Sequence, residues 1–332
     1  MIQIAEILLE QPPDPYWRIL RQVGVTHAVG VLPRRSFDWR SSAGELPWEY
    51  GPLALYKEQI ESTGLQLEVI EDNPPMDNIR LGSPGRDEEI EQFATLVRTM
   101  GRLEIPVLCY NWMTLFGWIR TSLSAPARGG ALAAGYDHDL LKDAPETRAG
   151  IVTDGRLWEN LGYFLEQIVP VAEEAGVRLA MHPDDPPRSP IRGIARIMRS
   201  TSAFQRLVEL VDSTANGITF CQGNFTLMTD DVPSVIRDLG RSGRIYFVHF
   251  RDVRGTVDRF VETFHDEGQT DMLECMRAYR DIGFNGVLRS DHSPTLEGDT
   301  SQVAGYSRIA RLHAIGYTMG LREAVYREAP GV

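Results

Sequence analysis

Short runs of apolar, often β-branched residues alternate along this chain with longer stretches whose apolar residues recur at helical spacing. Nearly continuous apolar runs are typical of strands buried on both faces, as in parallel sheets. The pattern therefore predicts parallel strands joined by helices. Eight strands are predicted: Ile2–Ile7, Thr26–Leu32, Leu65–Ile70, Val107–Tyr110, Arg178–Met181, Gly217–Cys221, Ile245–Phe250 and Gly286–Arg289.

The intervening segments carry helix start and stop signals. Asp14-Pro15 has the pattern of an N-cap followed by proline in the first helical turn. A glycine stands just before several predicted strands, where it would end the preceding helix. These glycines are Gly24, Gly64, Gly176 and Gly283.

One interval is much longer than the others and separates Tyr110 from Arg178. It predicts a loop insertion at about residues 113–155 followed by a helix at about Arg156–Ala175, and loops of this length are usually lids, interaction arms or disordered segments. No GxGxxG sequence follows any predicted strand. We therefore expect an α/β protein with one closed (β/α)8 TIM barrel as a single domain over residues 1–332.

Composition narrows the class of function. The 332 residues carry a net charge of −12, and no basic stripe suited to a phosphate backbone is present, so we expect no nucleic-acid partner. No apolar run reaches the roughly 18 residues of a membrane span, and the first residues lack a signal-peptide pattern. The 3 cysteines are widely spaced without a CxxC pair, which favours a reducing, cytoplasmic location.

Candidate chemistry lies just after the strands, because the carboxyl ends of barrel strands form the active sites of this architecture. Four successive predicted strands end in a potential metal ligand: His182, Cys221, His249 and Asp291. Each has a plain alternative, since an isolated histidine is often a surface residue, a buried cysteine a small hydrophobe and an aspartate a helix cap. Their joint occurrence at one barrel height predicts a metal centre. Two imidazoles, a thiolate and a carboxylate suit Zn²⁺, Fe²⁺ or Mn²⁺ better than Mg²⁺ or Ca²⁺.

The remaining histidines are weaker candidates. His27 begins a strand at the opposite end of the barrel, His313 belongs to the terminal helix pattern, and His138 falls in the long insertion. His265 follows the seventh strand in a loop, where it is either a substrate contact or a loop residue with no role in the site.

Several of these segments resemble one known family. The runs that carry the resemblance are Leu179–Pro187, Ala215–Cys221, Arg244–Arg251, Ala304–Ser307, Cys109–Met113 and Trp118–Thr121. They are similar to the D-mannonate dehydratases, over roughly residue 60 to the C-terminus and most densely from 178 to 310. The nine-residue run around His182 is the most specific of them.

The resemblance implies a xylose-isomerase-like barrel and a Mn²⁺- or Fe²⁺-dependent hydro-lyase, with Zn²⁺ as an alternative ion. Such enzymes convert D-mannonate into 2-keto-3-deoxy-D-gluconate and water. The family's metal ligands match the four residues named above, and its catalytic histidine and tyrosine match His292 and Tyr306. These two are expected to act as the acid and base, in an order left open. The alternative for Tyr306 is a packing role at the start of a helix.

Substrate contacts are expected from further polar residues. Arg289 and Arg251 are placed to hold a carboxylate, because guanidinium pairs with it in a bidentate manner. The alternative for both arginines is a salt bridge to Asp184, Asp185 or Asp252. Asn111, Asp184 and His265 complete the expected contacts to a small sugar acid, and we expect a homo-oligomer.

The chain departs from the family pattern in places. Gly30-Val31-Leu32-Pro33 replaces a His-His-Ile-Pro run, and Ser293-Pro294 replaces a Gly-His pair after His292. The stretch Pro33–Tyr50 has no counterpart that we recognise. The far end of the pocket is therefore expected to differ, and a less polar substrate would meet one of the tryptophans Trp39, Trp48, Trp112 and Trp118. Two other functions stay open: an isomerase or epimerase of the same barrel superfamily, and a binding protein without turnover.

Overall fold

The computed structural model describes residues 1–10, 14–33, 44–301 and 303–328. Eight parallel strands close into a barrel, in the order β1-β12-β9-β8-β7-β4-β3-β2. Their bounds are β1 Gln3–Leu8, β2 His27–Gly30, β3 Gln66–Glu71, β4 Val107–Asn111, β7 Arg178–His182, β8 Asn216–Cys221, β9 Ile245–His249 and β12 Val287–Arg289. The predicted TIM barrel and its eight strands are confirmed, with small shifts at the strand ends.

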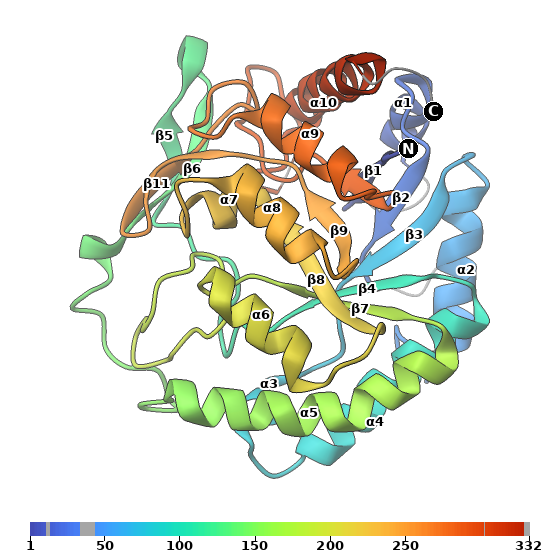
Figure 1. Ribbon diagram of the computed structural model, residues 1–332, viewed down its shortest axis with the longest axis vertical. Helices are drawn as coiled ribbons and strands as arrows, with labels where there is room; N and C mark the ends of the chain where they lie inside the picture. The colour runs from blue at the N-terminus through green and yellow to red at the C-terminus, as the bar shows by residue number, and fades with distance from the viewer. Residues whose placement is uncertain (11–13, 34–43, 302, 329–332) are drawn as a thin grey trace.

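Helices surround the barrel strands (Figure 1). They are α1 Pro15–Gln22, α2 Tyr50–Glu61, α3 Asp77–Leu81, α4 Arg86–Arg102, α5 Asp154–Ala175, α6 Thr201–Leu210, α7 Gln222–Thr226, α8 Val232–Gly240, α9 Met272–Asp281 and α10 Arg308–Glu328. The predicted cap of α1 forms, since the side chain of Asp14 accepts a hydrogen bond from Tyr16 N. Gly176 ends α5 with φ 68°, a left-handed backbone that glycine adopts without strain. Within the described ranges, no helix has the length and apolar character to cross a membrane.

The long insertion differs from the predicted loop. It contains β5 Ser122–Pro126 and β6 Leu132–Asp137, which join β10 Val253–Thr256 and β11 Arg259–Glu262 in a four-stranded antiparallel sheet. Short 3₁₀ turns at Arg128–Gly130 and His138–Leu140 flank β6. This sheet stands to one side of the barrel (Figure 1). Its strands come from two segments far apart in the sequence, so local pattern alone does not indicate the pairing.

Two apolar layers hold the barrel together. Alternate strand residues face opposite sides, so Ala5, Val69 and Phe247 belong to a small interior cluster, whereas Ile4 and Leu67 belong to the large layer beneath the helices. The interior cluster is small because polar side chains fill the carboxyl end of the barrel.

Phe164 on α5 tests the outer layer. Its buried ring lies 5.0 Å from Phe93, 5.9 Å from Tyr110 and 5.5 Å from Trp112. The change Phe164→Ala should lower the free energy of unfolding by about 3–5 kcal/mol, because it removes these contacts and leaves a cavity. Urea unfolding followed by circular dichroism measures this. Leu140→Ala, at a side chain that is 70% exposed, is the matched control and should change stability by less than about 0.5 kcal/mol. Equal effects of the two changes would contradict this packing.

Candidate metal centre and active-site cavity

The four predicted ligands come from four neighbouring strands of the barrel. His182, Cys221 and His249 are the last residues of β7, β8 and β9, and Asp291 follows β12 by two residues. These strands are adjacent in the order β12-β9-β8-β7, and Cys221 is in register with His249. Hydrogen-bonded register fixes the height of each strand, so all four side chains emerge at the same mouth.

The ligand atoms converge. His182 Nε2 lies 3.2 Å from His249 Nδ1, and Asp291 Oδ2 lies 3.6 Å from that same Nδ1 and 3.8 Å from Cys221 Sγ. One donor atom from each of His182, Cys221 and His249 lies within 4.8 Å of the others. Ligands about 2.0–2.3 Å from a tetrahedrally held ion stand roughly 3.3–3.8 Å from one another. The donor set and the spacing of His182, Cys221 and His249 therefore fit one shared divalent cation, and Asp291 lies beside two of these three residues.

The backbone at Asp291 has φ 63°, in the left-handed region that aspartate tolerates better than most residues. Successive side chains of an extended strand would point to opposite faces. The turn at Asp291 instead lets both it and His292 line the same cavity. This local geometry places a metal-ligand candidate and a catalytic candidate side by side.

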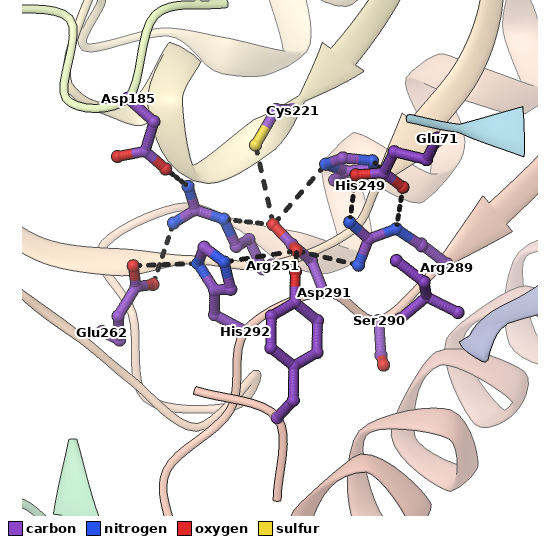
Figure 2. Close-up of polar contacts among 12 residues, drawn as sticks. Glu71, Asp185, Cys221, His249, Arg251, Glu262, Arg289, Ser290, Asp291 and His292 are labelled. Carbon is purple, nitrogen blue, oxygen red and sulfur yellow. Dashed lines mark hydrogen bonds and ion pairs between the residues drawn. The ribbon is translucent and has the colours of Figure 1, made fainter. Parts of the chain in front are cut away.

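The carboxylate of Asp291 lies at the centre of the polar contacts in Figure 2. Arg251 Nε donates to Oδ2 over 2.6 Å, while Oδ1 accepts from Tyr306 Oη at 3.1 Å and lies 2.8 Å from Arg289 Nη1. Burial alone would raise the pKa of Asp291, but Arg289, His292 and the other nearby cations lower it well below its ordinary value. The group is therefore ionised, which is the form that a metal ligand requires.

Two arginines and two carboxylates form a closed ring of ion pairs beside this centre. Arg120 and Arg251 each bind both Asp185 and Glu262. The four side chains are at most 2% exposed. Burial would raise the pKa of Glu262, but Arg251 and Arg120 outweigh it and lower the value to about 2. We call these four residues the ion-pair ring.

The two catalytic candidates meet at Asp291. His292 Nδ1 lies 3.1 Å from Glu262 Oε1, and its Nε2 lies 3.6 Å from Asp291 Oδ1. The rings of His292 and Tyr306 are edge to face, with centroids 5.2 Å apart, and Trp118 lies 5.2 Å from the other side of the imidazole. Burial raises the pKa of Tyr306 well above its ordinary value, so the phenol keeps its proton.

Glu71, the last residue of β3, contacts Arg289 and His249. It binds Arg289 through both oxygens, at 2.7 and 2.8 Å, and lies 3.3 Å from His249 Nε2. Burial would raise the pKa of Glu71, but Arg289 and His249 lower it to about 2. Glu71, Cys109 and His249 also lie close enough to hold an ion. Both oxygens of Glu71 also contact Arg289, so this carboxylate links Arg289 to His249.

A cavity of about 210 Å³ opens onto this centre. It is lined by Glu71, Asp72, Asn73, Cys109, Tyr110, Asn111, Met113, Gly117, Trp118, His182, Asp185, His249, Arg289, Asp291, His292 and Tyr306. Among these lining residues, four carboxylates face a single guanidinium group. An anionic substrate would be repelled by such a wall, and a divalent cation would offset part of that charge.

Several predicted substrate contacts lie elsewhere. Asp184 accepts a hydrogen bond from Met198 N at 2.8 Å, and His265 Nε2 donates to the Ser290 carbonyl over 2.7 Å. Burial lowers the pKa of His265 to about 4, so this imidazole is neutral. Asp184, His265 and Arg251 do not line the cavity, whereas Asn111 and Arg289 do. The salt bridge to Asp185 that was the alternative for Arg251 is present.

Sequence reasoning missed part of the site. Glu71 follows the same strand-end rule as the ligands, and extending the third predicted strand by one residue would have found it. Glu262 and Arg120 do not follow barrel strands, so the strand-end rule could not find them. Glu262 is the last residue of β11 in the small sheet, and Arg120 lies two residues before β5 of that sheet. Trp48 and Trp112 are absent from the cavity lining, Trp118 belongs to it, and Trp39 lies outside the described residues.

Comparison with known proteins identifies the family of the chain. The sequence model of the D-mannonate dehydratase (UxuA) family matches residues 18–154 and 148–330. A mannonate dehydratase of Thermotoga maritima is 36% identical, over 92% of each chain. Mannonate dehydratase 2 of Halalkalibacterium halodurans is 35% identical, over 84% of this chain and 88% of that protein.

A comparison with solved structures also finds a mannonate dehydratase. The crystal structure of mannonate dehydratase from Streptococcus suis serotype 2 superimposes with a TM-score of 0.88 at 31% identity, covering 99% of this chain and 96% of that one. D-psicose 3-epimerase from Clostridium cellulolyticum H10 matches with a TM-score of 0.62 at 13% identity, covering 97% and 99%, which shows a shared fold alone. The chain belongs to the D-mannonate dehydratase family of hydro-lyases.

Proposed function

We propose that this enzyme dehydrates a sugar acid, taking a proton from C2 and the hydroxyl from C3 and releasing them as water. The expected reaction is D-mannonate to 2-keto-3-deoxy-D-gluconate, or the same step on a related sugar acid. One observation carries the proposal: the ligand atoms of His182, Cys221 and His249 converge next to the Asp291 carboxylate, which a histidine and a tyrosine both approach.

His182, Cys221, His249 and Asp291 would hold the ion, which we propose to be Mn²⁺ or Fe²⁺, with Zn²⁺ as the alternative. Bound there, such an ion would supply Lewis-acid stabilisation of the charge that builds up beside the substrate carboxylate when the C2 proton leaves. The buried cluster favours such an ion. The carboxylates of Glu71, Asp185, Glu262 and Asp291 exceed the guanidinium groups of Arg120, Arg251 and Arg289 by one negative charge.

His292 and Tyr306 are the proposed proton-transfer pair. Both line the cavity, and both approach the same oxygen of Asp291, His292 Nε2 at 3.6 Å and Tyr306 Oη at 3.1 Å. The two groups therefore lie side by side on one wall of the cavity, within reach of the same bound substrate. One group removes the C2 proton and the other protonates the leaving hydroxyl.

Of the remaining polar residues, some are proposed to contact the substrate and others to hold protein side chains. Arg289 and Asn111 are the proposed substrate contacts, because they line the cavity. Arg251 is proposed to position Asp291, since protein carboxylates engage all its nitrogens.

Val31 stands where the resemblance predicts a histidine. It packs with Leu9 and Tyr306 against the interior cluster. Apolar side chains at this position favour substrates that need few hydrogen bonds at the far end.

The proposed location is a reducing cytoplasm. All 3 cysteines are unpaired and buried, and a thiol at Cys221 has to remain reduced to bind metal.

The reaction can be tested with D-mannonate and a panel of C5 and C6 sugar acids. Protein loaded with Mn²⁺ or Fe²⁺ should form a 2-keto-3-deoxy acid from at least one of them, measured by a colour reaction for such acids and by mass spectrometry. Chelator-treated protein is the control and should be inactive. Isomeric products without loss of water would replace the dehydratase proposal with an epimerase.

Cys221→Ser should lower the metal content sharply, because the softest ligand is lost. Elemental analysis of purified protein measures this. Cys275→Ser is the matched control, since Cys275 is an equally buried thiol on α9 and should keep full metal content. Full occupancy in the Cys221 variant would remove this residue from the ligand set.

His292→Ala and Tyr306→Phe should retain the metal and lose activity by about 10²-fold or more, because each removes a proton-transfer group and leaves all four candidate ligand side chains in the protein. Steady-state kinetics together with metal analysis checks both effects. Turnover at the wild-type rate in both variants would refute the assigned pair.

A further inference from the structure

The two nitrogens of the His292 imidazole have different surroundings. Nδ1 faces Glu262 Oε1 at 3.1 Å, and Nε2 faces the metal-ligand candidate Asp291 at 3.6 Å. An ionised carboxylate can only accept a hydrogen bond, and only the contact at Nδ1 is within hydrogen-bond distance, so Nδ1 is the nitrogen that carries the proton. In the neutral ring, Nε2 then presents its lone pair on the side of the cavity.

Glu262 is itself held firmly. Its Oε2 accepts from Arg251 Nη1 at 2.9 Å, and its Oε1 accepts from Arg120 Nε at 3.1 Å. The side chain has no exposed surface. Arg120 and Arg251 are fixed in turn by Asp185, at 2.6 and 2.9 Å. A closed ring of opposite charges leaves the carboxylate little freedom to rotate away from His292.

The ion-pair ring also sets the position of the metal-ligand candidate. Arg251 Nε donates to Asp291 Oδ2 over 2.6 Å. One guanidinium group therefore contacts both the ligand carboxylate and the residue that orients the imidazole (Figure 2). Arg251 therefore links the position of the Asp291 carboxylate to that of the Glu262 carboxylate.

Glu262 does not come from the barrel. It ends β11 in the small antiparallel sheet, and Arg120 lies two residues before β5 of the same sheet. β11 pairs with β6, and β6 pairs with β5. The small sheet therefore brings to the barrel mouth two side chains that no barrel strand supplies.

We infer that Glu262 is a positioning residue that fixes the tautomer and orientation of His292, and that the small sheet serves to hold it there. This inference rests on the proposed function, because it gives His292 a part in proton transfer. Without Glu262 the imidazole would exchange tautomers and turn about its side-chain bonds. Partners of this kind typically contribute 10–100-fold to activity.

Wild-type protein provides the first test and needs no variant. The Zn²⁺-loaded enzyme, labelled with ¹⁵N-histidine, should show His292 protonated at Nδ1 and unprotonated at Nε2, with the signals assigned by their loss in His292→Ala. Zn²⁺ is used because Mn²⁺ and Fe²⁺ broaden the resonances. A His292 ring protonated at Nε2 alone would overturn the inference, whether or not any sugar acid is turned over.

The second test removes the carboxylate. Glu262→Ala should lower kcat on D-mannonate by roughly 10–100-fold with little change in KM, and should give mixed tautomer signals at His292. Glu262→Gln keeps a hydrogen-bond acceptor and should restore part of the rate. Asp258→Asn is the matched control, because it removes a more exposed ion pair, with Arg188, beside the turn of the same hairpin and should leave rate and tautomer unchanged.

The outcomes separate this inference from the proposed function. An unchanged His292 tautomer in Glu262→Ala would assign Glu262 a purely structural role, even if activity fell. The predicted tautomer in wild-type protein that dehydrates no sugar acid would uphold the orienting contact and remove the proposed substrate. If the Glu262 variants fail to fold, the wild-type spectrum alone decides.

Discussion

The site depends on keeping several carboxylates ionised where little water reaches them. An isolated buried carboxylate costs several kcal/mol, and in most surroundings it would take up a proton. Here every guanidinium group of the cluster is shared between at least two carboxylates, so each arginine compensates more than one buried charge. The carboxylates of the cluster still exceed its guanidinium groups by one negative charge, which favours the binding of a divalent cation at this mouth.

Much of this arrangement follows from the sequence. The apolar runs locate eight strands, and the rule that barrel chemistry sits at the carboxyl ends of strands identifies His182, Cys221, His249 and Asp291 without coordinates. The structure brings these four side chains to one mouth because the pairing register of neighbouring strands sets the height of each side chain. His292 and Tyr306 required the family resemblance, since nothing in their own spacing indicates that they meet.

Other features depend on distant contacts that the chain pattern does not encode. Arg120 and Glu262 are separated by more than 100 residues, and they meet only because β6 pairs with β11. Asp184 and Asp185 show that the sequence pattern does not predict the contacts of individual neighbouring residues. Both follow the same strand in the same motif, yet Asp185 joins the ion-pair ring and Asp184 binds the backbone of Met198. Which of two neighbouring aspartates turns inward is decided by the loop path.

The left-handed backbone at Asp291 restricts how this enzyme can change over evolutionary time. Asparagine would fit the turn but would bring no charge, whereas glutamate would keep the charge but enters that backbone conformation reluctantly. A longer acidic side chain would also displace the carboxylate from Arg251 and Tyr306, which now grip it from two sides. The identity of this candidate ligand is thus restricted by chain geometry as well as by coordination chemistry.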